Sequence, residues 1–156
     1  MIEEAVADTL PGLGVAYALR FPFLHGEPGA HLPFQRLGRA AGLGASSPLG
    51  LQVHPTYGPW WAYRGLIVVD VALPPGPRLR DACAGCPAPC VQACPAGAVR
   101  VAGFDVPSCH ARRLTAEPCR LSCAARIACI RGPEHRYRDE ELAFHMLASL
   151  PSASPR

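Results

Sequence analysis

Eight cysteines in this chain of 156 residues all lie between Cys83 and Cys129, and none occurs earlier. Four of them fall in the run CAGCPAPCVQACP, which extends from Cys83 to Pro95. So many thiols in one short segment constrain the fold, because the chain has to loop around whatever holds them. Proteins hold such groups as disulfides, as zinc sites or as iron–sulfur clusters.

The spacing of the first four cysteines favours iron and sulfide. The pattern Cys-x3-Cys-x3-Cys-Pro that ends at Pro95, with a Cys-x2-Cys pair at its start, is close to the bacterial ferredoxin run. In that run three cysteines hold one cluster and the fourth, before proline, holds another. Small residues such as Ala84 and Gly85 let the backbone come close to a cluster. One extra residue separates Cys86 from Cys90 compared with the ferredoxin run.

Four further cysteines complete a second set, so eight thiolates suffice for two [4Fe–4S] clusters. By ferredoxin logic, cluster one would be held by Cys83, Cys86, Cys90 and Cys129. Cluster two would be held by Cys94, Cys109, Cys119 and Cys123. The wide spacing of the last three cysteines differs from common ferredoxins, which leaves a single cluster or a three-iron form as alternatives.

Zinc is the main competing interpretation, since two zinc sites with four cysteines each would also use eight thiolates. Zinc sites usually contain separated Cys-x2-Cys pairs, and this chain has only one such pair. The proline after Cys94 also has no role in a zinc knuckle. We therefore expect iron–sulfur clusters, with a zinc-stabilised binding module as the alternative.

Composition and charge limit the location and the partners. The segment MIEEAVADTL lacks the basic start and apolar run of a signal peptide, and Gly65–Leu73 is too short to span a bilayer. We expect a cytoplasmic protein with no membrane partner, in a reducing compartment that disfavours disulfides. A net charge of +3 is too small to indicate nucleic acid by itself.

Arginine is dense in the cysteine half. The relevant residues are Arg100, Arg112, Arg113, Arg120, Arg126, Arg131, Arg136 and Arg138. Nearby guanidinium groups would stabilise negatively charged clusters and raise their reduction potentials. An RNA-binding face, with tRNA as the partner, is the alternative, although no aromatic-rich RNA motif accompanies these residues.

The local patterns predict an α+β fold. Helices are expected at residues 2–10, Pro33–Gly44 and Arg138–Pro151, and strands at Gly14–Phe21, Leu49–His54 and Trp60–Leu73. The last two strands are expected to flank the turn PTYGP, and Pro74–Asp81 is expected to form a stiff linker.

The segment Ala41–Pro75, followed by eight cysteines with a lone Cys109 among them, resembles the cobalamin-dependent epoxyqueuosine reductases. The stretches HPTYGPWWAYRGLIVV from His54 and HRYRDEELAFH from His135 are similar to the cobalamin-processing chaperones of the methylmalonic aciduria type C family. The resemblance extends over roughly Ala41–Leu147.

This resemblance implies a shortened flavin-reductase-like cobalamin-binding domain and a ferredoxin-like two-[4Fe–4S] module. The implied domains are residues 1–76, residues 77–137, and a C-terminal helix and tail at residues 138–156 that pack on the first domain. The clusters would pass electrons to a corrinoid or an associated reductase site, with a redox partner protein as donor. Cobalamin would lie near His54, Tyr57, Trp60 and Trp61.

Alternatives remain for these residues and for the activity. His54 precedes a proline and suits a turn, and one or both tryptophans would instead fill the core. The acidic proton donor of the reductases has no counterpart upstream, where Glu27 is the nearby carboxylate. Whether the chain is a cobalamin-dependent oxidoreductase is therefore open. A ferredoxin-like carrier or accessory subunit without its own substrate is the alternative.

Overall fold

A computed structural model describes residues 2–22 and 32–150 of the chain, which fold as short helices and small two-stranded sheets. The chain forms two compact units. The first contains the residues up to Ala41 together with Ala62–Arg78, and the second contains Gly42–Trp61 and the residues from Leu79 onward. Within the described ranges, no helix has the length and apolar character needed to cross a membrane.

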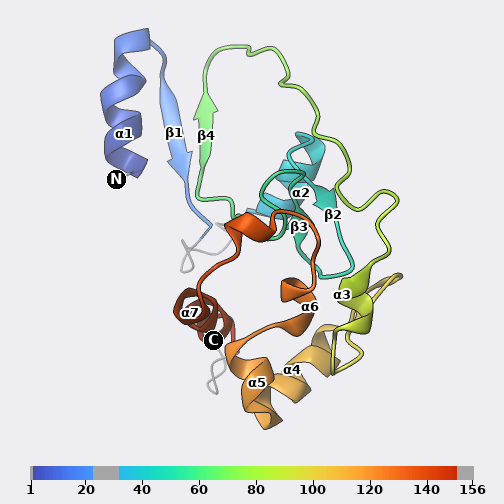
Figure 1. Ribbon diagram of the computed structural model, residues 1–156. Coiled ribbons are helices and arrows are strands. Elements are labelled where there is room, and N and C mark those ends of the chain that lie inside the picture. The colour runs from blue at the N-terminus through green and yellow to red at the C-terminus, as the bar shows by residue number, and fades with distance from the viewer. Residues whose placement is uncertain (1, 23–31, 151–156) are drawn as a thin grey trace. The chain divides into compact units, whose positions relative to one another are not determined.

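The first unit is organised by one antiparallel strand pair. Its elements are α1 (Ile2–Thr9), the 3₁₀-helix η1 (Pro11–Leu13), β1 (Tyr17–Arg20), α2 (Phe34–Ala40) and β4 (Leu66–Val69). Strands β1 and β4 lie side by side in Figure 1, with Tyr17 opposite Val69. The Asp70 carboxylate extends this pairing by accepting a hydrogen bond from the Ala16 amide at 3.1 Å.

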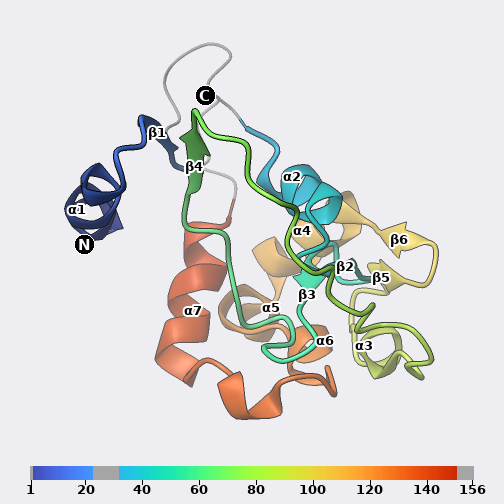
Figure 2. The ribbon, with the colours of Figure 1, turned by 90° about the horizontal axis from the view of Figure 1, so that it is seen from above.

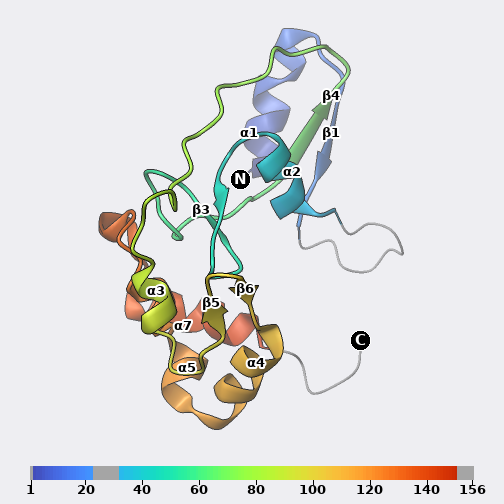
Figure 3. The same cartoon turned by 90° about the vertical axis from the view of Figure 1, so that its right-hand side faces the viewer.

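The second unit consists of short elements that alternate with the cysteines. They are β2 (Ala45–Ser46), β3 (Gln52–Val53), α3 (Pro89–Gln92), β5 (Val99–Arg100), β6 (Gly103–Phe104), α4 (Val106–Thr115), α5 (Glu117–Leu121), α6 (Ala124–Ile127), the 3₁₀-helix η2 (Pro133–His135) and α7 (Asp139–Ala148). Helix α3 packs against β5, as Figure 2 shows, and α5 contacts both α4 and α7 (Figure 3).

A small core holds the cysteine half together. Leu49, Cys90, Val99 and Ala125 are buried in it, and Phe104 packs against them. Each of these residues comes from a different loop or short element. Segments that are too short to be stable alone are therefore fixed by their shared burial and by the loops between the cysteines.

All three predicted helices are confirmed. Helices α1, α2 and α7 and strand β1 lie inside the ranges expected from the sequence, and the linker Pro74–Asp81 has no regular structure. The segment with Glu27, and the tail after Leu150, lie outside the described residues.

Short strands lie within both ranges predicted around PTYGP, β3 in Leu49–His54 and β4 in Trp60–Leu73, but they do not pair with each other. Strand β3 pairs with β2, and β4 pairs with β1 in the other unit, so the two strands never meet in one ladder. Only an isolated bridge joins His54 to Gly58. Pro59, the next residue after Gly58, has no backbone N–H with which to continue the ladder. The side chains of Trp60 and Trp61 instead contact Tyr137 and the Gln52 carbonyl, respectively.

The compact units also differ from the domain boundaries implied by the resemblance at residues 76 and 137. Residues 42–61 cluster with the cysteine half and not with residues 1–41. Helix α7, which was expected to pack on the first domain with residues 138–156, contacts α5 within the second unit. Long-range contacts, which composition does not reveal, determine this division.

Candidate metal centres

The eight cysteines separate into two groups of four, each lining one cavity of the second unit. The first cysteine site, with a cavity of about 170 Å³, contains Cys83, Cys86, Cys90 and Cys129. The second cysteine site, with a cavity of about 30 Å³, contains Cys94, Cys109, Cys119 and Cys123. All eight are free thiols. This division in space coincides with the two ligand sets that the ferredoxin pattern predicts, while ligation itself stays a prediction.

The first cysteine site is built from turns. The Asp81 carboxylate accepts a hydrogen bond from the Cys83 amide at 2.8 Å, and the Cys86 amide donates to the Cys83 carbonyl at 3.1 Å. Ala88 then takes a left-handed conformation with φ 54° and starts α3, which carries Cys90. These turns fold the loop back on itself and bring its three cysteines to the same cavity.

Cys129 reaches the first cysteine site from far along the chain, and two glycines make its approach possible. A Cβ on Gly58 would lie 1.9 Å from the Arg131 carbonyl oxygen, and one on Gly132 would lie 2.5 Å from the Tyr57 carbonyl carbon. Both glycines have positive φ. The turn that ends at Gly58 thus contacts, backbone to backbone, the segment that follows Cys129.

Arg131 connects the same segment to the loop of the first three cysteines. Its Nε donates a hydrogen bond to the Ala82 carbonyl at 2.9 Å, and its side chain lines the cavity. The guanidinium therefore joins the two stretches of chain that the first cysteine site needs. Breaking either this bond or the glycine contact would separate Cys129 from its partners.

The second cysteine site is built from helix ends. Cys109 lies in α4, Cys119 in α5, and Cys123 is the N-cap residue of α6. Cys94 follows α3 directly, before Pro95. Of these three helices, α4 has a side-chain cap, provided by Asp105, whereas α5 and α6 have none.

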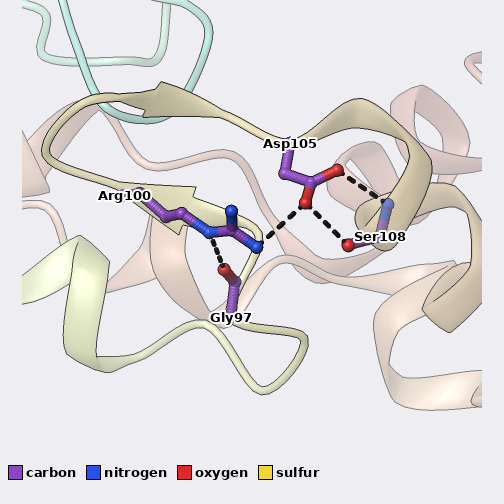
Figure 4. A network of polar contacts seen from close by, with 4 residues as sticks. All are labelled: Gly97, Arg100, Asp105 and Ser108. Atoms are coloured by element: carbon purple, nitrogen blue, oxygen red, sulfur yellow. Dashed lines mark hydrogen bonds and ion pairs between the residues drawn. The ribbon is translucent and has the colours of Figure 1, made fainter.

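A polar network fixes the start of α4 (Figure 4). The Asp105 carboxylate caps the helix by accepting from the Ser108 amide at 3.1 Å and from its hydroxyl at 2.8 Å. Arg100 donates to the same carboxylate at 2.9 Å and to the Gly97 carbonyl at 3.0 Å. The network thus links the turn after Cys94 to the helix that carries Cys109.

Two arginines flank the second cysteine site. Arg113 is 6% exposed, and one terminal nitrogen donates to the Met146 carbonyl and to the Ser149 hydroxyl. Arg126 donates to the Pro59 carbonyl at 2.6 Å. Its guanidinium carbon lies 4.6 Å from the ring centre of Trp60, in cation–π contact.

The electrostatic surroundings of the two sites differ. Burial, followed by the negative charge of Asp81, raises the pKa of the Cys83 thiol to about 11. Burial also raises the pKa of Cys109, but there the positive charge of Arg113 opposes it. At Cys123 burial raises the pKa, and the Arg126 amide and guanidinium oppose it. Without metal, the thiols of Cys83, Cys109 and Cys123 therefore favour their protonated form, and a bound metal would have to displace their protons.

The spacing of the thiols bears on the kind of metal group. Among the described residues, no group of three or more potential ligand side chains is arranged to hold a single metal ion. A zinc ion with Zn–S bonds of about 2.3 Å would draw four sulfurs to about 3.8 Å from one another. A four-iron cluster spaces its thiolates more widely, because its own iron and sulfide atoms lie between them.

The volumes of the two cavities indicate how much room each cysteine site has for a cluster. A cavity needs a volume of about 10–15 Å³ to hold one water molecule. The first cavity, at about 170 Å³, therefore has room for a polyatomic group. The second, at about 30 Å³, has room for roughly two waters. The first cysteine site fits a cluster as it stands, whereas the second would have to widen.

The residues expected near cobalamin make other contacts. His54 Nδ1 accepts hydrogen bonds from the Thr56 amide at 3.0 Å and the Tyr57 amide at 3.2 Å. The neutral ring then carries its proton on Nε2, so no nitrogen lone pair is left for cobalt. His54 thus has the turn role that its place before a proline indicates.

The two tryptophans are also engaged in packing. Trp60 is 5% exposed and stacks on Arg126 and Tyr137, and the indole of Trp61 donates to the Gln52 carbonyl at 3.0 Å. Tyr57, at 45% exposed, has the most accessible ring of the four. Contact of these residues with a corrinoid stays a prediction, and neither cysteine cavity includes them.

Sequence reasoning did not single out several residues that organise the sites. Gly58 and Gly132 each precede a proline, which signals a turn, but their mutual contact is long-range. Arg113 and Arg126 were counted only as members of an arginine-rich region. Comparisons with protein-family models, curated proteins and solved structures find no match to this chain. Its function has to be inferred from the two cysteine sites themselves.

Proposed function

We propose that this chain is an iron–sulfur electron-transfer protein that holds one [4Fe–4S] cluster at each cysteine site. The observation that carries the proposal is the division of eight free thiols into two sets of four, each around its own cavity. Each set combines cysteines from separate segments, so the fold itself gathers them. No thiol is left over for another purpose.

The chemistry of such centres is electron transfer. A cluster bound at each site would accept one electron from a reduced flavin or iron–sulfur donor protein and release one electron to an acceptor. The chain's thiolates would hold the irons, and the small turn residue Ala88 lines the first cavity between Cys86 and Cys90. The guanidiniums of Arg113, which is buried, and of Arg126, which is half-buried, supply positive charge to cysteines of the second site.

Two roles in electron transfer suit this proposal. The resemblance over Ala41–Leu147 supports a corrinoid or an associated reductase site, within a flavin-reductase-like domain joined to a ferredoxin-like module. The contacts of His54 and Trp60 favour the second possibility, a carrier or accessory subunit without its own substrate, since both side chains are used in packing.

The test is metal and sulfide analysis of the chain purified without oxygen. We expect about eight irons and eight sulfides per chain, and an electron paramagnetic resonance signal after reduction with dithionite. A colourless preparation with about two zinc ions per chain and no sulfide would replace the proposal with the zinc-stabilised module.

Adding cobalamin distinguishes these two roles. If a corrinoid is the acceptor, the reduced chain should bind cobalamin and convert cob(II)alamin to cob(I)alamin, at one electron for each cobalt. A carrier should leave the cobalamin spectrum unchanged and instead reduce a soluble one-electron acceptor protein. Tyr57→Ala, which removes the most exposed ring, should weaken cobalamin binding in the first case only.

A further inference from the structure

Two arginine donors near the second cysteine site have no acceptor among the described residues. Arg113 lines the cavity of this site, and Arg126 lies in α6, three residues after Cys123. The donors are the Nε–H groups of Arg113 and Arg126, both shielded from solvent and without a partner in the described part of the chain. Leaving a buried donor unpaired, above all on a charged group, is costly. Such groups in a native fold call for an acceptor, and sulfur ligands beside them would supply one.

Arg113 is held in position by helix α7. The carbonyl of Met146 and the hydroxyl of Ser149, at the end of that helix, accept hydrogen bonds from its terminal nitrogen. The carbonyl end of a helix carries partial negative charge, which suits a guanidinium. The same side chain lines the second cavity, where its charge acts on Cys109.

Arg126 is held in position by aromatic rings. Its guanidinium carbon lies 4.6 Å from the Trp60 ring centre and 4.9 Å from that of Tyr137, and its terminal nitrogen donates to Pro59. No carboxylate of the described chain pairs with Arg126 directly, although Glu141 acts on it from further away. Its charge is therefore available to Cys123, which it influences.

The first cysteine site lacks this arrangement. Arg131 lines its cavity, but the Nε–H of that side chain already donates to the Ala82 carbonyl. The charged group that acts on Cys83 is the carboxylate of Asp81. A guanidinium thus borders each cavity, but among the described residues the arginine Nε–H groups without an acceptor are those of Arg113 and Arg126, and a carboxylate acts on Cys83 at the first site.

Resting on the proposed function, we infer that Arg113 and Arg126 make the second cysteine site the higher-potential end of the electron path. Reduction adds one negative charge to a cluster, and buried cations and N–H donors stabilise that charge more than the oxidised form. An electron released at the first cysteine site is then gained at the second. The second site holds the electron until an acceptor takes it.

The experiment is a redox titration of the full-length protein, followed by electron paramagnetic resonance. Cys90→Ala, which removes a ligand of the first cysteine site only, identifies which potential belongs to the second. Arg113→Gln and Arg126→Gln should each lower that potential by at least a tenfold change in the one-electron equilibrium, about 59 mV. The other potential should stay where it is.

Arg112→Gln is the matched control. Arg112 neighbours Arg113 in α4 and also lines the second cavity, but it is exposed to solvent, which screens its charge. The control should leave both potentials nearly unchanged. Arg126→Lys, which keeps the charge and loses the Nε–H group, should recover part of the loss, a result that a merely structural role would not give.

The outcomes are distinct. Arg113→Gln removes the hydrogen bonds of Arg113 to Met146 and Ser149 and could therefore prevent folding. In that case the potentials of Arg126→Gln and Arg126→Lys still test the inference. Two clusters whose potentials do not respond to either arginine, or respond equally, would overturn this inference and leave the proposed function intact. A chain that binds zinc and no iron would overturn both.

Discussion

The two cysteine sites of this chain share a ligand type but differ in what encloses them. The cavity of the first cysteine site is bordered by Val101, 81% exposed, and Ile130, 50% exposed. The smaller cavity of the second is bordered by Met146 of α7 and by the buried guanidinium of Arg113. One site is thus formed by loops at an apolar surface, and the other by helix ends and positive charge.

The difference teaches that equal numbers of ligands do not make equivalent centres. Groups beyond the ligands set the charge, the hydrogen bonding and the solvent access of a metal site. Here the first cysteine site depends on a backbone contact between Gly58 and Gly132, and the second on the Asp105 cap and on Arg113 and Arg126. Substitutions at these supports should therefore affect one site and spare the other.

Paired cysteine substitutions test the division most strongly. Cys129→Ala should lower the iron content of the anaerobic protein by about half, because removing a ligand loses a whole cluster. Adding Cys83→Ala, at the same site, should cost little more. Adding Cys123→Ala, at the other site, should remove most of the remaining iron.

Iron and sulfide per chain provide the measurement, with circular dichroism to show that each variant is folded. A within-site pair that loses all its iron would mean that the two sets of cysteines are not independent. A cross-site pair that still retains half would mean that Cys129 and Cys123 serve one centre.

Gly58→Ala tests the support of the first cysteine site. The new Cβ would meet the Arg131 carbonyl oxygen at 1.9 Å, and the left-handed backbone alone should cost about 1–2 kcal/mol. We expect a lower urea midpoint and loss of iron from the first cysteine site, since the segment after Cys129 must shift. The second cysteine site should keep its iron.

Gly97→Ala is the control for this substitution. Gly97 has φ +58° against +59° at Gly58, but a Cβ there would meet nothing within 4 Å. Its cost should be limited to the backbone term, with both sites still loaded. Equal losses from the two variants would show that the contact with Arg131 does not position Cys129.

Local signals explain which parts of this fold could be predicted. Helix α7 starts with Asp139, Glu140 and Glu141, which favour the first turn of a helix, and α2 starts just after Pro33. The helices α5 and α6 were not predicted, because they have only five and four residues and give little periodicity. Helix α4 was not predicted either, although it is as long as α7. The pairing of β4 with β1 depends on contacts between distant segments, and no local pattern reveals these.

The candidate sites also have features that the sequence predicts locally and features that depend on distant contacts. The cysteine spacing predicted two sets of four, because ligand spacing is a local property of the sequence. The partners of Arg113, at residues 146 and 149, lie more than thirty residues further along the chain, and Pro59, the partner of Arg126, lies 67 residues before it. Only the folded chain shows that the Nε–H groups of these two arginines, among the many in this region, are shielded from solvent and have no partner in the described residues.

Asp105 provides the smallest test, through the helix that carries Cys109. Hydrogen bonds from the Ser108 amide and hydroxyl, with the charge of Arg100, hold the pKa of Asp105 below its ordinary value. A carboxylate with a lowered pKa in the folded state stabilises the fold above its unfolded pKa, and loses that effect as the pH falls through the folded value. Asp105→Asn keeps a capping oxygen and removes the charge, whereas Asp105→Ala removes both.

Thermal unfolding followed at several pH values separates these contributions. Near pH 7 both variants should unfold a few degrees below the parent chain, with Asp105→Ala lower because α4 loses its cap. The difference between the parent and Asp105→Asn should shrink as the pH falls below the ordinary carboxyl pKa and through the lower folded-state pKa, because the carboxylate is then protonated in both states. A difference that stays constant with pH would assign the effect to shape instead of charge. Iron lost on warming should come first from the second cysteine site, because α4 positions Cys109 there and contributes no cysteine to the first.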